Sequence, residues 1–90
     1  MKIKKEMHRI YFVNDNQEEI AFVTFPFVQE GIVCIDHTVV KEEYRGLHLA
    51  EQLLENAFET IRFEGWKVKI SCSYAKHWVS KHMEYQDILI

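Results

Sequence analysis

The hydrophobic pattern changes its period near residue 50, and this change constrains the fold more than any other feature of the chain. Residues 32–40 are nearly all apolar or β-branched, which is typical of a strand covered on both faces. Residues 47–64 then show helical spacing, and residues 66–72 alternate with a period of two. The apolar face of the helix comprises Ala50, Leu53, Leu54, Ala57, Phe58 and Ile61. Because strand, helix and strand in this order form a crossover, we expect the two strands to be parallel.

The chain before the crossover contains two further β-rich segments. Residues 8–13 and 18–25 are separated by the turn cluster Asn14-Asp15-Asn16, and Gln29-Glu30-Gly31 makes a second turn before residue 32. Three strands joined by short turns predict an antiparallel meander.

The two ends are less regular. Lys2, Lys4 and Lys5 read as a solvated basic tail. Gly65 lies where a helix cap belongs, residues 74–81 predict a short second helix, and the last residues read as irregular. The element order is therefore β-β-β-α-β-α. The predicted class is a mixed α+β fold with an antiparallel meander and one parallel crossover strand.

Length and charge exclude several classes of protein. Ninety residues suit one small domain, which we assign to residues 1–90. A net charge of −3 argues against a general nucleic-acid binder. No apolar run reaches the length of a membrane span, and no secretory signal is recognisable. The two cysteines are too few for a secreted disulfide framework, so we expect a reduced, cytoplasmic protein.

The loop that connects residues 32–40 to the helix has the composition of an anion-binding site. A helix N-terminus leaves about four backbone N–H groups without partners and carries a partial positive charge. Arg45 adds a full charge and a forked donor set that suits phosphate, and Gly46 allows a close approach. The stretch therefore predicts a phosphate or pyrophosphate site. An ordinary helix start with a solvated arginine is the alternative.

The order of residues around this site resembles a known motif. Val40-x-x-x-x-Arg45-x-x-His48-x-Ala50 is similar to the acetyl-CoA-binding motif of the GCN5-related N-acetyltransferases. His48 occupies the position where that motif has glycine. The pairs His37-Thr38 and Arg45-Gly46, Cys72, and the ending His82-x-Glu84-Tyr85 also resemble a small single-domain branch of that superfamily. Relatives usually have proline where this chain has Met83.

The resemblance implies a minimal acyl-CoA N-acyltransferase-like fold and acetyl-CoA as co-substrate. It implies that the backbone of Arg45, Gly46, Leu47, His48, Leu49 and Ala50 holds the pyrophosphate. Backbone groups around Val39 and Val40 would pair with the pantetheine arm like an added strand.

The resemblance also suggests reactive residues. Cys72 would take the acetyl group or orient the acceptor, although a small hydrophobe at the end of a strand is the alternative. His37 would act on the acceptor side as a base or an orienting group, or would only bond to the backbone. Tyr74 would line the thioester end, or belong to the buried face of its helix.

Metal binding is not predicted. The side chains of Cys34 and His37 lie on opposite faces of a strand, because an odd separation changes the face. His77 and His82 would lie about 140° apart around a helix. Neither pair has the geometry of a zinc site.

Two functions remain open at this stage. The first is an N-acetyltransferase that moves acetyl from acetyl-CoA to an amine, on a small molecule or a protein, either directly or through Cys72. The second is a non-catalytic module that binds CoA or another protein.

Overall fold

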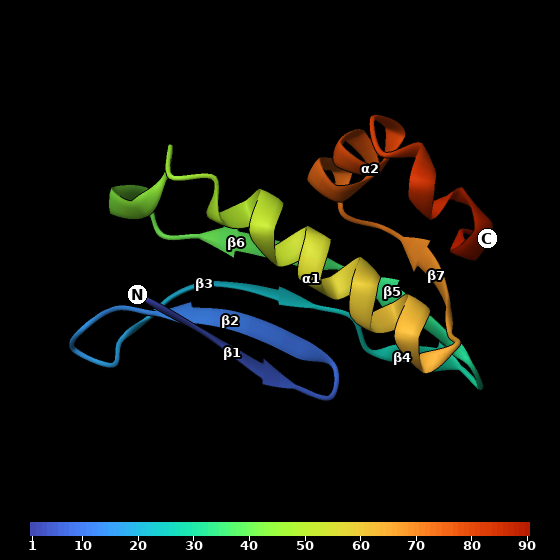
Figure 1. Ribbon diagram of the computed structural model, residues 1–90, viewed down its shortest axis with the longest axis horizontal. Coiled ribbons are helices and arrows are strands. Elements are labelled where there is room, and N and C mark those ends of the chain that lie inside the picture. The colour runs from blue at the N-terminus through green and yellow to red at the C-terminus, as the bar shows by residue number, and fades with distance from the viewer.

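The computed structural model describes residues 1–90 and contains two sheets that diverge from one another (Figure 1). The first sheet has the order β1-β2-β3-β6 and is antiparallel throughout. Its strands are β1 (Lys2–Glu6), β2 (Arg9–Val13), β3 (Glu19–Thr24) and β6 (His37–Val40). The second sheet has the order β4-β5-β7, with strands β4 (Phe27–Gln29), β5 (Ile32–Ile35) and β7 (Lys67–Ile70). The helices are α1 (Leu49–Glu64) and α2 (Ser73–Ser80), with 3₁₀ helices at Glu42–Tyr44 and Met83–Ile88.

The predicted strand over residues 32–40 is divided at Asp36. Its first half, β5, pairs in parallel with β7, which confirms the predicted crossover through α1. Its second half, β6, pairs with β3 instead. Beyond Ile70 the chain turns away, and the backbone N–H groups of Ser71 and Cys72 both donate to the oxygen of Ile35. As a result β6 lies at the edge of its sheet, and its outer side has no strand partner.

The basic N-terminal segment is a strand, and the prediction of a solvated tail was wrong. β1 pairs with β2 along its whole length, from Lys2 opposite Val13 to Glu6 opposite Arg9. Ile3 packs against the core while the lysines stay exposed. Exposed lysines on an edge strand also discourage pairing with a second chain.

The core lies between α1 and the sheets. It contains twenty buried residues, among them Leu53, Leu54, Phe58 and Ile61 of the predicted helical face. Leu49 is buried, whereas Ala50 is only half-buried. Gly65 ends α1 in a left-handed conformation, as its position predicted, and its N–H donates to the oxygens of Arg62 and Ile61.

The C-terminal residues are more regular than the sequence indicates. Tyr85 is buried and stacks on Phe58 with the ring centroids 5.0 Å apart, and its hydroxyl donates to Glu59 at 2.6 Å. These contacts fix the 3₁₀ helix Met83–Ile88 against α1.

Candidate functional site

The loop between β6 and α1 has a conformation that few residues adopt. After the 3₁₀ turn Glu42–Tyr44, Gly46 has a φ of +87° and His48 has a φ of +61°. His48 is the N-cap of α1 and makes no capping hydrogen bond with its side chain. Glycine adopts positive φ without a penalty, whereas histidine does so only at a cost. His48 stands where the motif has glycine, and its backbone still adopts the left-handed conformation.

This conformation leaves a run of backbone donors without acceptors. The N–H groups of residues 46–51 make no hydrogen bond within the chain, and the first bond that closes the helix runs from Gln52 N to His48 O at 3.2 Å. A helix start ordinarily leaves about four such groups. The additional two come from the turn at Gly46 and Leu47. Six successive free donors at the positive end of a helix dipole create a local environment that favours an anion.

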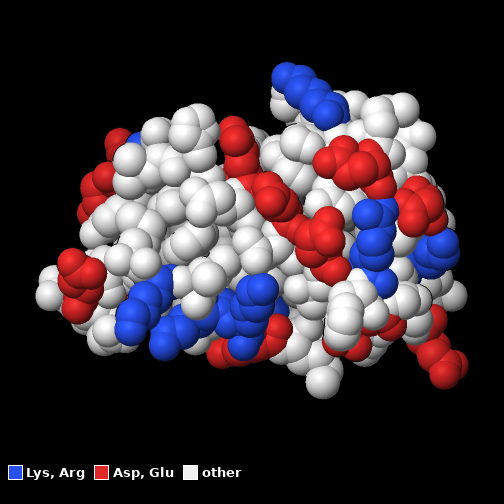
Figure 2. All heavy atoms as spheres, viewed as in Figure 1, with Lys and Arg blue, Asp and Glu red and all other residues white.

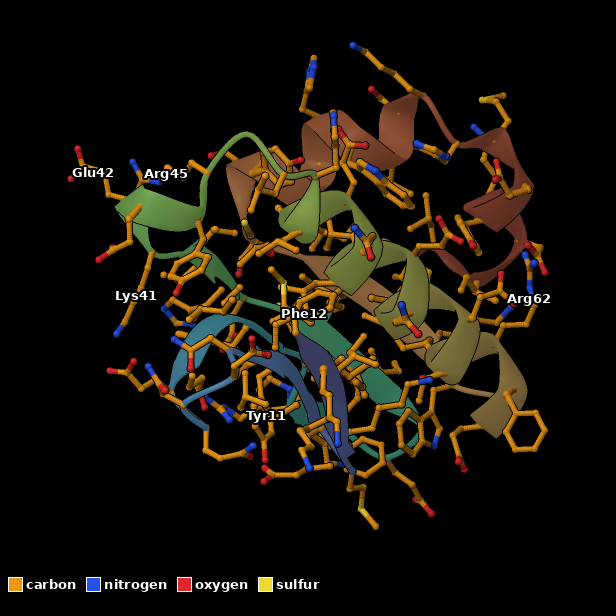
Figure 3. All side chains as sticks on the ribbon, turned by 60° about the vertical axis from the view of Figure 1, so that its left-hand side comes forward. Tyr11, Phe12, Lys41, Glu42, Arg45 and Arg62 are labelled. Atoms are coloured by element: carbon orange, nitrogen blue, oxygen red, sulfur yellow. The ribbon has the colours of Figure 1, made fainter.

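Arg45 lies at the mouth of this turn. Its Nε donates to the backbone oxygen of Val40 at 3.2 Å, which ties the guanidinium to the end of β6. Figure 3 shows Arg45 and Glu42 at the outer end of the loop, with Lys41 pointing away from Arg45. Arg45 makes no salt bridge to a carboxylate, so its remaining donors are available to a ligand.

A hollow of about 210 Å³ lies against the donor run. It is lined by Val40, Tyr44, Arg45, Gly46, His48, Leu49, Ala50, Glu51 and Tyr74. A second hollow of about 430 Å³ shares Val40, Arg45, Ala50 and Tyr74 with the first and extends to Thr38 and Val39. Seven of the nine residues named from the sequence for CoA therefore line the first hollow. Val39 lines the second, and the side chain of Leu47 is exposed at the turn without lining either.

The free edge of β6 runs along the second hollow. Lys41 N donates to Ile20 O on the β3 side, and in an antiparallel pair the direction of the backbone groups alternates. Thr38 and Val40 consequently direct their N–H and C=O groups toward the free edge, where Arg45 already bonds to Val40. Val39 pairs with Phe22 and directs its backbone into the sheet. We expected the backbone around Val39 and Val40 to be available for strand-like pairing with a ligand. The backbone groups of Thr38 and Val40 are available at the free edge, whereas those of Val39 are already paired within the sheet.

Cys72 lies across from β6 at the point where the sheets diverge. It follows the carboxyl end of β7 and is the N-cap of α2. The thiol is half-buried, and its Sγ lies 3.7 Å from the hydroxyl of Thr38. The sequence pointed to Thr38 only through the pair His37-Thr38, and its contact with Cys72 is visible only in the structure.

His37 is separated from Cys72 by the alternation of the strand. Because Thr38 faces Cys72, its neighbour His37 points to the opposite face of β6. The imidazole is exposed, and its Nδ1 lies 3.3 Å from a carboxylate oxygen of Asp36. The hydroxyl of Thr24 donates to the same carboxylate. The structure does not bring the two predicted catalytic side chains into contact.

Tyr74 stands at the centre of the site. It lines both hollows and is 41% exposed. Burial raises the pKa of its hydroxyl, with smaller contributions from the negative charges of Glu51 and Cys72. The phenol therefore remains a neutral hydrogen-bond donor well above neutral pH.

Besides Tyr44, the sequence did not indicate Glu51 as a residue of this site. Its carboxylate lines the hollow at the donor run, and His48 Nδ1 lies 3.4 Å from it. The only signal for it is the position, three residues after the N-cap, where a side chain returns toward the helix start.

No group of three His, Cys, Asp or Glu side chains is arranged to hold a metal ion. None of the helices combines the length and apolar character that crossing a membrane requires.

The fold matches that of acyl-CoA N-acyltransferase-like proteins. A family model described as GCN5-related N-acetyl-transferase matches residues 9–88. The chain therefore belongs to the GCN5-related N-acetyltransferase family, as its motif predicted.

Individual relatives agree with this assignment. A GCN5-like protein from Staphylococcus aureus, solved by NMR, is 34% identical, covers 99% of this chain and 87% of its own, and gives a TM-score of 0.80. Protein NATD1 of Danio rerio is 28% identical over 72 residues, which are 78% of this chain and 66% of that protein. The chain thus spans just under two thirds of that relative. Escherichia coli YhbS, solved in complex with CoA, shares the fold at 24% identity and a TM-score of 0.62, over 69% of this chain and 38% of its own.

Proposed function

We propose that this protein binds acetyl-CoA and transfers its acetyl group to an amine. The observation that carries the proposal is the run of six free backbone N–H groups, residues 46–51, beside Arg45 and the free edge of β6. A diphosphate is the ligand that such a run of donors and one arginine suit best.

The arrangement of the hollows supports an extended thioester carrier. With the diphosphate at residues 46–51, the pantetheine arm would follow the hollow along β6. Its amide groups would pair with the backbone of Thr38 and Val40, like an added strand. This course leads toward the thiol of Cys72, which contacts Thr38. The CoA complex of YhbS, which has the same fold, supports CoA as the carrier.

Two routes for the transfer are consistent with this placement. In the direct route the amine lone pair forms a bond to the thioester carbon, the carbon–sulfur bond breaks, and CoA leaves as the thiolate while nitrogen loses its proton. In the covalent route the Cys72 thiolate attacks first and expels CoA. The amine then attacks acetyl-Cys72 and releases the cysteine thiolate.

A non-catalytic CoA-binding module is the second candidate, and one observation favours it. The polar contact of the Cys72 thiol is the hydroxyl of Thr38, which is no base at neutral pH, while His37 faces the other side of the strand. A general base for either route would then come from the acceptor or from solvent.

Both candidate functions require CoA binding, and a titration with CoA followed by NMR tests it. We expect the amide signals of residues 46–51 to shift on addition of CoA, while those of the β1–β2 turn stay in place. Unchanged signals at millimolar CoA would overturn CoA binding altogether. Release of free thiol from acetyl-CoA in the presence of a panel of amines then separates the enzyme from the module.

A further inference from the structure

A further hollow lies between the edge strand β1 and the second half of α1, away from the donor run. Its volume is about 370 Å³, and we call it the β1–α1 hollow. One rim is a strand that pairs with β2 alone. The other rim is one side of α1, because residues three and four apart are neighbours on a helix surface. The lining residues are Lys5, Asn56, Glu59, Thr60 and Phe63.

Phe63 is the most exposed large apolar side chain of the protein. It is 88% exposed, although Phe58 and Ile61 of the same helix are fully buried in the core. A phenyl ring left in water loses the stabilisation that burial would give. Aromatic residues are also enriched in the buried centres of protein interfaces. Phe63 at the rim of a hollow therefore has the position of an anchor for a docking partner.

The two rims carry opposite charges that do not neutralise one another. Lys5 on β1 and Glu59 on α1 both line the hollow, yet they form no salt bridge with each other or with any other residue. Figure 2 shows this division on a larger scale. Acidic side chains follow α1 as a red diagonal, and basic side chains gather below it, on the side where β1 lies in Figure 1.

A two-fold axis through the hollow makes this surface complementary to itself. The rotation exchanges the two rims, so Lys5 of each copy faces Glu59 of the other. Because Phe63 lines the hollow, the same rotation buries both Phe63 rings between the copies. A partner of one charge sign would match one rim only, whereas a second copy matches both. The contact is made by side chains and does not pair the backbone of β1, which its lysines disfavour.

We propose that the β1–α1 hollow is the contact surface of a symmetric homodimer, in which Lys5 of each copy pairs with Glu59 of the other and Phe63 is buried at the centre. The inference does not depend on the proposed function, because no residue lining the hollow at the donor run also lines the β1–α1 hollow. The surface is small, so the association is weak and depends on protein concentration.

Sedimentation velocity on the intact chain tests the proposal. We expect mainly monomer at about 10 µM and mainly dimer near about 1 mM, the range of a weak contact. Phe63→Ser should weaken the association at least about tenfold, as the loss of a central aromatic anchor does. Met83→Ser is the matched control, because Met83 is also an exposed apolar side chain, at 64%, and does not line the hollow.

Two results of this experiment would overturn the dimer. One is a wild-type chain that stays monomeric over the whole range of concentration. The other is equal association of Phe63→Ser and Met83→Ser. Amide spectra of all variants establish that they are folded, and neither result bears on CoA binding.

A charge series tests the pairing across the axis. Glu59→Gln should weaken the dimer, because it removes the attraction to Lys5 of the other copy while keeping an acceptor for the hydroxyl of Tyr85. Glu55→Gln changes the net charge equally but lies outside the hollow, so it should associate as wild type does or slightly more strongly. In a Lys5→Glu background, Glu59→Gln should strengthen the dimer instead, because it relieves a repulsion between like charges. Equal effects of Glu59→Gln and Glu55→Gln would overturn the proposed contact.

Discussion

Arg45 is tied back to the strand that it follows, because its Nε donates to the backbone oxygen of Val40 at 3.2 Å. This bond spans five residues and bridges the end of β6 and the turn before α1. It uses one of the five guanidinium donors and leaves the others at the hollow beside residues 46–51. The arginine is thus positioned before any ligand arrives.

Arg45→Ala should weaken CoA binding by about tenfold, because a positioned guanidinium contributes roughly 1.5–3 kcal/mol to a charged partner and exposure reduces this. Calorimetry measures the change. Glu42→Ala, in the same loop and lining none of the hollows, is the control and should bind CoA as wild type does or slightly better. Equal affinities of the two variants would remove Arg45 from the phosphate site.

Gly46 should tolerate asparagine better than valine. A Cβ at Gly46 would meet nothing within 4 Å, so the protein leaves room for a side chain. The cost of a substitution comes instead from the φ of +87°, which L-residues rarely adopt. A residue other than glycine in this conformation costs about 1–2 kcal/mol, and asparagine is among the least affected. Urea unfolding should therefore rank wild type above Gly46→Asn and Gly46→Asn above Gly46→Val. A similar loss in both variants would contradict backbone strain as the cause of the ranking.

Glu51→Gln should shift affinity and stability in opposite directions. Removing a carboxylate from the hollow at the donor run should tighten CoA binding about twofold to fivefold. It should also destabilise the fold by about 0.3–1 kcal/mol, because an acidic residue in the first turn favours the helix dipole. Calorimetry and urea unfolding measure the two effects. Glu55→Gln, one turn further along α1 and outside the hollows, should leave CoA affinity unchanged.

Cys72→Ala should reduce acetyl transfer while leaving CoA affinity within about twofold, because the thiol contacts Thr38 and lines none of the hollows. Intact mass spectrometry after incubation with acetyl-CoA then identifies the route. One acetyl group on wild type and on Cys34→Ser, but none on Cys72→Ala, would establish the covalent route. Full turnover by Cys72→Ala would exclude Cys72 from the chemistry.

Stability should decline at alkaline pH through Tyr85. Burial and the hydrogen bond to Glu59 raise the pKa of its hydroxyl above the ordinary value, in that order of size. The unfolded chain loses this proton near pH 10, whereas the folded chain retains it. The stabilisation is therefore complete below about pH 10 and is lost progressively above it. Urea unfolding between pH 8 and about 11.5 should show a smaller decline for Tyr85→Phe than for wild type. Equal slopes would contradict the assignment.

The spacing of apolar residues and the position of Gly65 predicted the elements that depend on interactions within short segments. The spacing of apolar residues located α1 to within two residues of its start, and Gly65 marked its end, because periodicity and a left-handed cap are properties of short segments. The parallel crossover between β5 and β7 followed from the order of the elements. The basic start was misread because three lysines indicate a tail unless a partner strand is known.

The sequence by itself determined the family, the crossover and the glycine-containing turn that precedes α1. Only the tertiary structure decided that residues 32–40 divide between two sheets at Asp36, which leaves the edge of β6 open. It also decided that Cys72 contacts Thr38 while His37 faces away, and that Glu51 lines the hollow at the donor run. Periodicity records which face of each element is buried, whereas these relationships depend on how separate elements pack together, and no local pattern contains that information.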